Sequence, residues 1–168
     1  PRTQSLVLWG GHDGSAALSD TWQFANGMWI RQLPVLSPGG TVLASASTDR
    51  RLNLVTLFVM DTQTLTAQPW QWHGSAWAPA LTSPPPTHCW PELSTFDEST
   101  GECLVVSGGL ARGLWSWNGS RWASVLGSTG MPPGVPTSFT FDRRRLVPVL
   151  GTTDSNPMGS SRVWELRS

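Results

Sequence analysis

The sequence "LWSWNGSRW" (Leu114 to Trp122) places three tryptophans within nine residues, around an Asn-Gly pair. Asn-Gly is favoured in the two-residue turns of β-hairpins, because both residues tolerate the positive φ that these turns require. Residues on either side of such a turn alternate between the two faces of the sheet. We therefore interpret this stretch as two antiparallel strands joined by a tight turn.

The same hairpin pattern recurs through the chain. Matching segments read "TWQFANGMW", "PWQWHGSAW" and "VWELRS", and successive hairpins begin 45 to 49 residues apart. In three of the four hairpins a second tryptophan follows seven residues after the first. The repeat tryptophans are Trp22, Trp29, Trp70, Trp77, Trp115, Trp122 and Trp164. A period of this length indicates a repeat architecture.

Two further strand-like runs precede each hairpin. The outgoing runs end at Asp49, Asp97 and Asp142, and returning runs such as "LNLVTLFVM" and "ECLVVSGG" are apolar enough to be buried on both faces. Glycine pairs close two of the returning runs, where a turn without Cβ atoms is useful. These glycines are Gly10, Gly11, Gly108 and Gly109. One repeat therefore contains four strands.

A repeated four-stranded unit of this length is typical of a β-propeller blade. The succession of a strand, "GG", "DTWQF" and a closing Trp resembles the kelch repeat, particularly that of bacterial kelch propellers. The resemblance covers essentially the whole chain and implies an all-β propeller of about three and a half antiparallel blades, with 14 strands. The expected divisions are a partial blade 1 (1–34), blade 2 (35–82), blade 3 (83–129) and a partial blade 4 (130–168).

The two partial blades do not complement each other. Aligned on the repeat, blade 1 lacks its first strand and blade 4 lacks its fourth, so the ends overlap instead of completing one blade. We expect the chain to belong to a larger propeller or to complete its ring with another chain. Since uncovered strand edges invite pairing, we do not expect a compact monomer.

The composition sets limits on partners and origin. The net charge is zero, and all 11 basic residues are arginines, which together with the 17 glycines suggests a GC-rich bacterial genome. The longest apolar run, 52–60, is too short to span a membrane. No targeting segment is evident, so the compartment stays open. We expect Cys89 and Cys103 to be buried thiols, with a disulfide between them as the alternative in an oxidising compartment.

Successive antiparallel strands are joined at alternate ends of a blade, so the sequence alone assigns each loop to one of the two ends. One end collects the candidate ligand or partner residues, because loops at one mouth of a propeller form its binding site. These candidates are His12, Asp13, His88, Trp90, Arg112 and Asp154. His12 and His88 would have to converge across the ring to form a metal or polar-ligand site. Their spacing matches no metal motif, and we predict neither a metal nor a cofactor.

The opposite end is expected to carry arginines and acids in similar numbers. The arginines are Arg2, Arg50, Arg51, Arg143, Arg144 and Arg145, and the acids are Asp49, Asp97, Glu98, Glu102 and Asp142. The acids offset the positive field, which argues against nucleic acid as a partner. We expect the aspartate repeated at this end to accept hydrogen bonds from its own turn backbone.

The tryptophans fall into two groups. Periodic aromatic residues in a propeller mostly fill the space between blades, so we expect the repeat tryptophans to be structural. Trp9 and Trp90 lie outside the repeat and are the better candidates for stacking on a ligand such as a sugar.

The absence of tyrosine excludes two kinds of propeller enzyme within these residues. Galactose-oxidase-like proteins need tyrosine ligands to copper, and sialidase-like propellers need a tyrosine nucleophile. No Ser/His/Asp elbow is present, and we assign no catalytic residue. We predict a non-catalytic binding or protein-interaction scaffold whose partner is a protein, another copy of the chain or the rest of a larger propeller. The alternative is a carbohydrate-handling propeller, either a lectin or a sugar-acid mutarotase.

Overall fold

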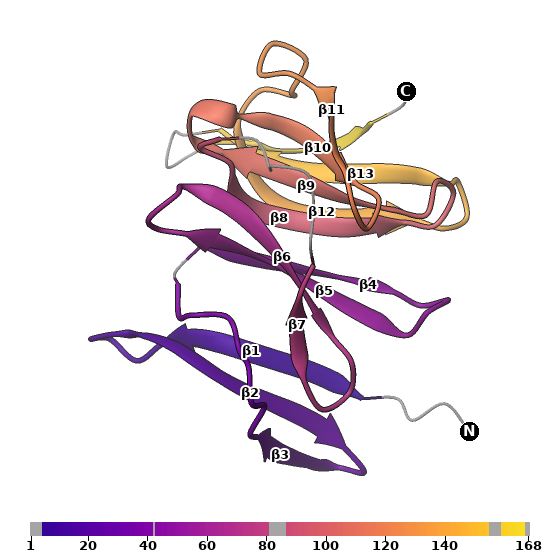
Figure 1. The fold of residues 1–168 in the computed structure, drawn as a ribbon. Coiled ribbons are helices and arrows are strands. Elements are labelled where there is room, and N and C mark those ends of the chain that lie inside the picture. Colours follow the sequence, from indigo (N-terminus) through magenta and orange to yellow (C-terminus); the bar gives the residue numbers. More distant parts are fainter. Residues whose placement is uncertain (1–4, 42, 81–86, 155–158, 167–168) are drawn as a thin grey trace.

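The computed structural model describes residues 5–41, 43–80, 87–154 and 159–166. Within these ranges the chain has 14 β-strands, one 3-10 turn and no α-helix. The strands form four antiparallel sheets of 3, 4, 4 and 3 strands, and in each sheet the neighbours in sequence are neighbours in space (Figure 1). The predicted all-β class and the number of strands in each repeat are confirmed. No helix in the described part of the chain is long and apolar enough to cross a membrane.

We name the four sheets A to D in chain order. Sheet A contains β1 (Leu6–His12), β2 (Ala17–Ala25) and β3 (Met28–Gln32). Sheet B contains β4 (Ala44–Asp49), β5 (Leu54–Asp61), β6 (Thr66–Trp72) and β7 (Trp77–Pro79). Sheet C contains β8 (Trp90–Asp97), β9 (Glu102–Gly108), β10 (Gly113–Trp117) and β11 (Trp122–Leu126), with the 3-10 turn η1 (Gly109–Ala111) after β9. Sheet D contains β12 (Val135–Asp142), β13 (Val147–Thr153) and β14 (Ser161–Glu165).

The strand register shows that the sequence repeat is a structural repeat. In every sheet the first tryptophan of the hairpin lies opposite an apolar residue of the returning strand. The four pairs are Trp22 with Leu8, Trp70 with Leu57, Trp115 with Val105 and Trp164 with Leu150. Residues at matching distances from these pairs are therefore structural counterparts in the four sheets.

Each sheet has two different faces. Its aromatic face carries the hairpin side chains, which are Trp22, Phe24 and Trp29 in sheet A, Trp70, Trp72 and Trp77 in sheet B, and Trp115, Trp117 and Trp122 in sheet C. Its receiving face carries alternate residues of the returning strand, which are Val7 and Trp9, Thr56 and Phe58, Leu104 and Val106, and Val149 and Gly151 in sheets A to D.

The sheets stack in chain order, with sheet A at the bottom of Figure 1 and sheets C and D at the top. The aromatic face of sheet B packs on the receiving face of sheet A, where Trp72 and Trp77 meet Val7 and Trp9. Sheets C and D repeat this contact. Phe58 of sheet B packs against two tryptophans of sheet C, and Val106 of sheet C packs against Leu150 of sheet D. One packing rule therefore joins all four sheets.

The close backbone approaches between sheets involve the first strands of sheets B, C and D. β4 lies beside β8, and β8 lies beside β12. Sheets B, C and D are thus closest to one another at their first strands.

The two cysteines are free and buried, as expected. The Ser47 hydroxyl lies 3.1 Å from the Cys103 sulfur in the contact between sheets B and C. Burial raises the pKa of the Cys103 thiol to about 11 and also raises the pKa of Cys89. Both therefore serve as small core residues.

The repeated aspartate organises the turn between the first two strands of sheets B, C and D. The Asp97 carboxylate accepts hydrogen bonds from the backbone N–H groups of Ser99 and Thr100, at 2.8 and 3.2 Å. Asp49 and Asp142 accept the equivalent pairs of bonds. The sequence-based expectation for this aspartate is confirmed.

We expect Asp97→Ala to lower the free energy of unfolding by about 1–2 kcal/mol, because two backbone donors lose a charged acceptor. Asp97→Asn keeps an oxygen in the same place and should restore most of the loss. Urea denaturation monitored by tryptophan fluorescence measures both. An asparagine variant as unstable as the alanine variant would show that the turn bonds are not the cause.

Candidate functional site

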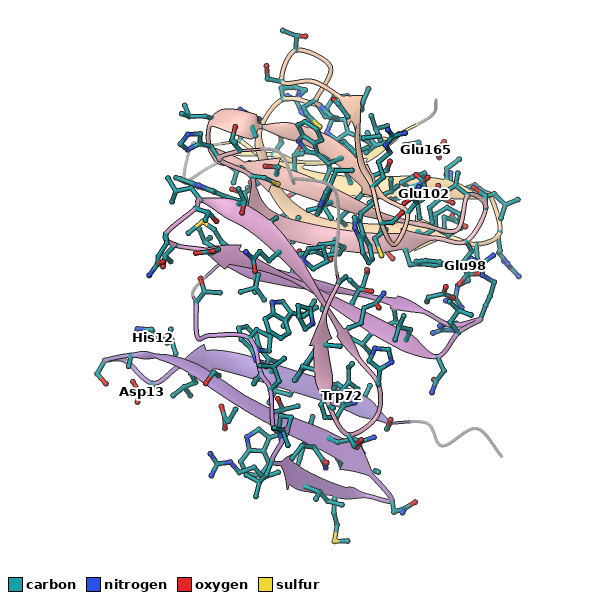
Figure 2. The ribbon with its side chains drawn as sticks, viewed as in Figure 1. His12, Asp13, Trp72, Glu98, Glu102 and Glu165 are labelled. Carbon is teal, nitrogen blue, oxygen red and sulfur yellow. The ribbon has the colours of Figure 1, made fainter. Side chains whose placement is uncertain are left out.

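The connections sort to two ends of the stack as the alternation of strands predicts. The loops that follow β1, β5 and β9 lie at the left-hand end of Figure 1, and the turns that follow β4, β8 and β12 lie at the right-hand end. Figure 2 shows His12 and Asp13 at the first end and Glu98 and Glu102 at the second. We call the first of these the loop end.

The predicted site residues share the loop end but do not form one cluster. His12 and Asp13 belong to sheet A, while His88, Trp90 and Arg112 belong to sheet C and its loops. Asp154 follows β13 in sheet D. His12 and His88 do not converge, because sheet B lies between the sheets that carry them (Figure 1). No group of three or more His, Cys, Asp or Glu residues in the described ranges could hold a metal ion.

Asp13 shapes the loop between β1 and β2. Its carboxylate accepts hydrogen bonds from the backbone N–H groups of Ser15 and Ala16, at 2.8 and 2.9 Å. These bonds, with that from Ala16 the largest, lower the pKa of Asp13 to about 2. Nδ1 of His12 accepts a bond from the Gly14 N–H, so the neutral imidazole carries its proton on Nε2 as a donor. Asp13 is therefore a turn residue, and His12 keeps a donor for a ligand.

Asp154 is likewise engaged within its own loop. Its carboxylate accepts a hydrogen bond from the Ser160 hydroxyl at 3.1 Å and lies 4.0 Å from the Arg162 guanidinium. These contacts hold the ends of β13 and β14 together. The Asp154 carboxylate therefore already has partners within its own loop. This makes Asp154 a weaker candidate for binding a ligand than its place at the loop end indicated.

Trp90 stands beside the 3-10 turn η1. A Cβ atom at Gly109 would lie 2.9 Å from the Trp90 indole and 3.0 Å from the His88 carbonyl oxygen, and Gly109 has a positive φ of 66°. A side chain at Gly109 would therefore displace the indole. The Ala111 N–H donates to the same His88 carbonyl, at 3.3 Å, which fixes this turn against the start of β8.

A cavity of about 250 Å³ lies between sheets C and D at the loop end. Arg112 and Glu92 both line it, together with Met131 and the backbone of Gly108 and Gly109. The Arg112 guanidinium donates to the Gly134 carbonyl of the segment before β12, at 3.2 Å. A Cβ atom at Gly108 would collide with the Glu92 carboxylate, so this glycine makes room for the acid. The structure therefore places a cationic donor and an anionic acceptor in one cavity.

A second cavity, of about 460 Å³, occupies the equivalent place between sheets A and B. Trp9, His12 and Thr41 line it, with Leu57 and Trp77 among its apolar residues. The Trp9 indole N–H is buried and has no hydrogen-bond partner among the described residues. Trp9 is the counterpart of Val106 in the repeat, and Val106 lines the cavity between sheets C and D. A cavity therefore lies at the same position of the repeat in two contacts, between sheets A and B and between sheets C and D.

The sequence indicated some of these residues and missed others. Arg112, His12 and Trp9 were singled out, and each lines one of the two cavities. Glu92 and Thr41 were not. Glu92 lies in β8 among polar and apolar neighbours that read as an ordinary strand, and only the stacking of sheet D on sheet C brings it to a cavity.

At the opposite end Arg51, Arg143 and Arg145 each lie beside an acid. Arg143 contacts Glu98 at 2.8 Å, and Arg145 contacts both Asp142 and Glu165. Arg145 lowers the pKa of Asp142 by a side-chain hydrogen bond. The Arg51 guanidinium lies 5.5 Å from the centroid of the Phe96 ring. Arg2 lies outside the described residues.

A scan against protein-family models found no match, and a search of curated proteins found none either. Among solved structures, the chain is similar to a fucose lectin from Kordia zhangzhouensis, which was determined in complex with methyl-fucoside. The two chains are 13% identical, with a TM-score of 0.46. The alignment covers 76% of this chain and 92% of the lectin chain.

Proposed function

We propose that this chain is part of a kelch-like β-propeller that binds carbohydrate without catalysing a reaction. The propeller assignment is supported by the repeated four-stranded pattern, by the single packing rule between sheets and by the side-by-side first strands β4, β8 and β12. The carbohydrate assignment reverses the order of preference that the sequence suggested, in which a protein partner came first.

The observation that carries the proposal is the pairing of Arg112 and Glu92 in one cavity. A sugar offers neighbouring hydroxyl groups, each of which can accept from a guanidinium and donate to a carboxylate. Arg112 has no carboxylate partner among the described residues, and Glu92 has no cationic one, so both charges are available to such hydroxyls. The Trp90 indole, 38% exposed beside the same loop, offers an apolar surface for a ring's C–H groups.

The cavity between sheets A and B fits the same chemistry. The unpartnered Trp9 N–H is a donor that a hydroxyl oxygen would satisfy, and His12 supplies a second donor through Nε2. Two equivalent cavities in one chain would give a multivalent binder, whose avidity exceeds the affinity of either site.

The test is a glycan microarray followed by calorimetric titration of the best ligand. We expect Arg112→Ala and Glu92→Gln each to weaken binding at the cavity between sheets C and D by ten-fold or more, because each removes a charged hydrogen-bonding group. Arg121→Ala is the matched control, since this exposed arginine lies in the β10–β11 turn at the opposite end. No glycan binding, or binding that neither variant weakens, would contradict the proposal.

A protein-interaction scaffold is the second candidate function. The observation that favours it is the row of large apolar side chains exposed on sheet A, which includes Leu6, Leu8 and Trp29. Exposed apolar patches on a soluble chain commonly mark a protein interface.

A further inference from the structure

Among the described residues, no sheet packs on the aromatic face of sheet A. Sheet B covers the other face of sheet A, and the aromatic face points away from the stack, at the bottom of Figure 1. By strand register this face carries Leu6, Leu8, Leu18, Trp22, Phe24 and Trp29. Trp29 is 49% exposed, whereas its counterpart Trp77 in sheet B is 2% exposed. The same repeat position is thus buried in one sheet and open in the other.

The uncovered face already has the geometry of the buried ones. Phe24 and Trp29 have ring centroids 5.3 Å apart, with an angle of 53° between the rings. Their counterparts Trp72 and Trp77 are 5.2 Å apart at 51°. The aromatic pair of sheet A is therefore arranged as it would be beneath a preceding sheet, although the described residues contain no such sheet.

The chain itself shows what covers such a pair. Val7 and Trp9 of sheet A cover the pair in sheet B, and Phe58 of sheet B covers the pair in sheet C. In both contacts the covering residues belong to the receiving face of the preceding sheet. An aromatic face is never packed on another aromatic face in the described stack.

Among the described residues, no sheet packs on the receiving face of sheet D, at the other end of the stack. In sheet D, Val149 is the counterpart of Val7, and Gly151 is the counterpart of Trp9. Both lie on the face of β13 opposite to that of Leu150. Val163 lies opposite Gly151 on the neighbouring strand and is 74% exposed. The Ser138 side chain of β12 fills the space beside Gly151, so Val149 and the exposed Val163 supply the apolar surface that the aromatic face of sheet A would contact.

We propose that the aromatic face of sheet A docks on the receiving face of sheet D in a second copy of this chain. The contact repeats the rule that joins sheets A to B, B to C and C to D. It is independent of the carbohydrate proposal. Because two different faces meet, the contact is heterologous, and copies joined in this way close into a ring when the rotation per copy allows.

Two single variants and their mixture test this proposal. Trp29→Asp places a charge on the aromatic face of sheet A, and Val163→Asp places one on the receiving face of sheet D. Both positions are exposed in the single chain, so the variants should fold, and far-ultraviolet circular dichroism checks this. Leu110→Asp is the control, at a residue 86% exposed in η1, away from both faces.

Sedimentation velocity gives the masses. We expect the wild type and Leu110→Asp to sediment as assemblies whose mass is a multiple of 18.2 kDa, and each face variant to sediment as a monomer with association weakened at least a hundred-fold. An equimolar mixture of the two face variants retains one intact pair of faces and should give a dimer of twice 18.2 kDa. A monomeric wild type, a Val163→Asp variant that still assembles, or a mixture that stays monomeric would overturn the proposal.

Discussion

Phe58→Ala is expected to lower the free energy of unfolding by about 3–5 kcal/mol, the usual cost of removing a buried phenylalanine ring. Phe58 in β5 is fully buried and joins sheet B to sheet C. Its ring meets those of Trp117 and Trp122 edge to face, with centroids 5.7 and 5.5 Å away. Alanine would leave a cavity beside both tryptophans. Guanidinium denaturation monitored by tryptophan fluorescence measures the loss.

Two companion variants make the Phe58 result specific. Phe58→Leu keeps part of the volume and should cost less than Phe58→Ala. Leu110→Ala removes an exposed side chain and should change stability by no more than about 0.5 kcal/mol. A Phe58→Ala variant that lost under about 1 kcal/mol would mean that sheets B and C do not share the described core.

Trp77→Ala should cost a similar amount, about 3–5 kcal/mol, and should act mainly on sheet A. The Trp77 ring fills the contact between sheets A and B, and its indole N–H donates to the buried Thr21 hydroxyl at 2.9 Å. Removing the ring takes away both the packing and this bond. Hydrogen exchange should show protection lost in β1, β2 and β3 and retained in β9 and β10.

Trp77→Phe separates the two contributions. Phenylalanine keeps most of the apolar contact but leaves the Thr21 hydroxyl without its donor, which should cost about 1–3 kcal/mol. If Trp77→Ala instead reduced protection equally in all four sheets, the sheets would unfold as one unit, and the sheet-by-sheet account of their contacts would be wrong.

The strands and turns could be predicted because they depend on local sequence. Trp115 and Trp122 lie in the two strands of a hairpin whose turn contains Asn118 and Gly119. The Asn118 side-chain oxygen accepts hydrogen bonds from the backbone N–H groups of Ser120 and Arg121. Asp97 acts in its turn through residues two and three positions away. Such bonds join residues that are close together in the sequence, so the sequence alone is enough to predict them.

The surroundings of those strands could not be predicted in the same way. Trp29 and Trp77 occupy the same repeat position, yet only Trp77 is buried, because burial depends on whether a sheet precedes it. Glu92 and Arg112 share a cavity only because sheet D packs on sheet C. His12 and His88 lie apart because the stacking places sheet B between the sheets that carry them.

The central claim is that one packing rule joins sheets both within a chain and between copies, and a cross-link tests it most directly. In the contact between sheets A and B, Leu57 packs in one cluster with Val7. Leu57 is the counterpart of Leu8, and Val7 is the counterpart of Val149, so the proposed contact brings Leu8 of one copy beside Val149 of the other. Chains carrying Leu8→Cys are mixed with chains carrying Val149→Cys and treated with a short bismaleimide. The native cysteines are buried with raised pKa values, so the new thiols react first.

We predict a covalent dimer of twice 18.2 kDa, in which the peptide around position 8 of one chain is joined to the peptide around position 149 of the other. Leu8→Cys chains alone should give no such dimer. Cross-linking of Leu8→Cys chains to each other, or no cross-link in the mixture, would contradict the claim.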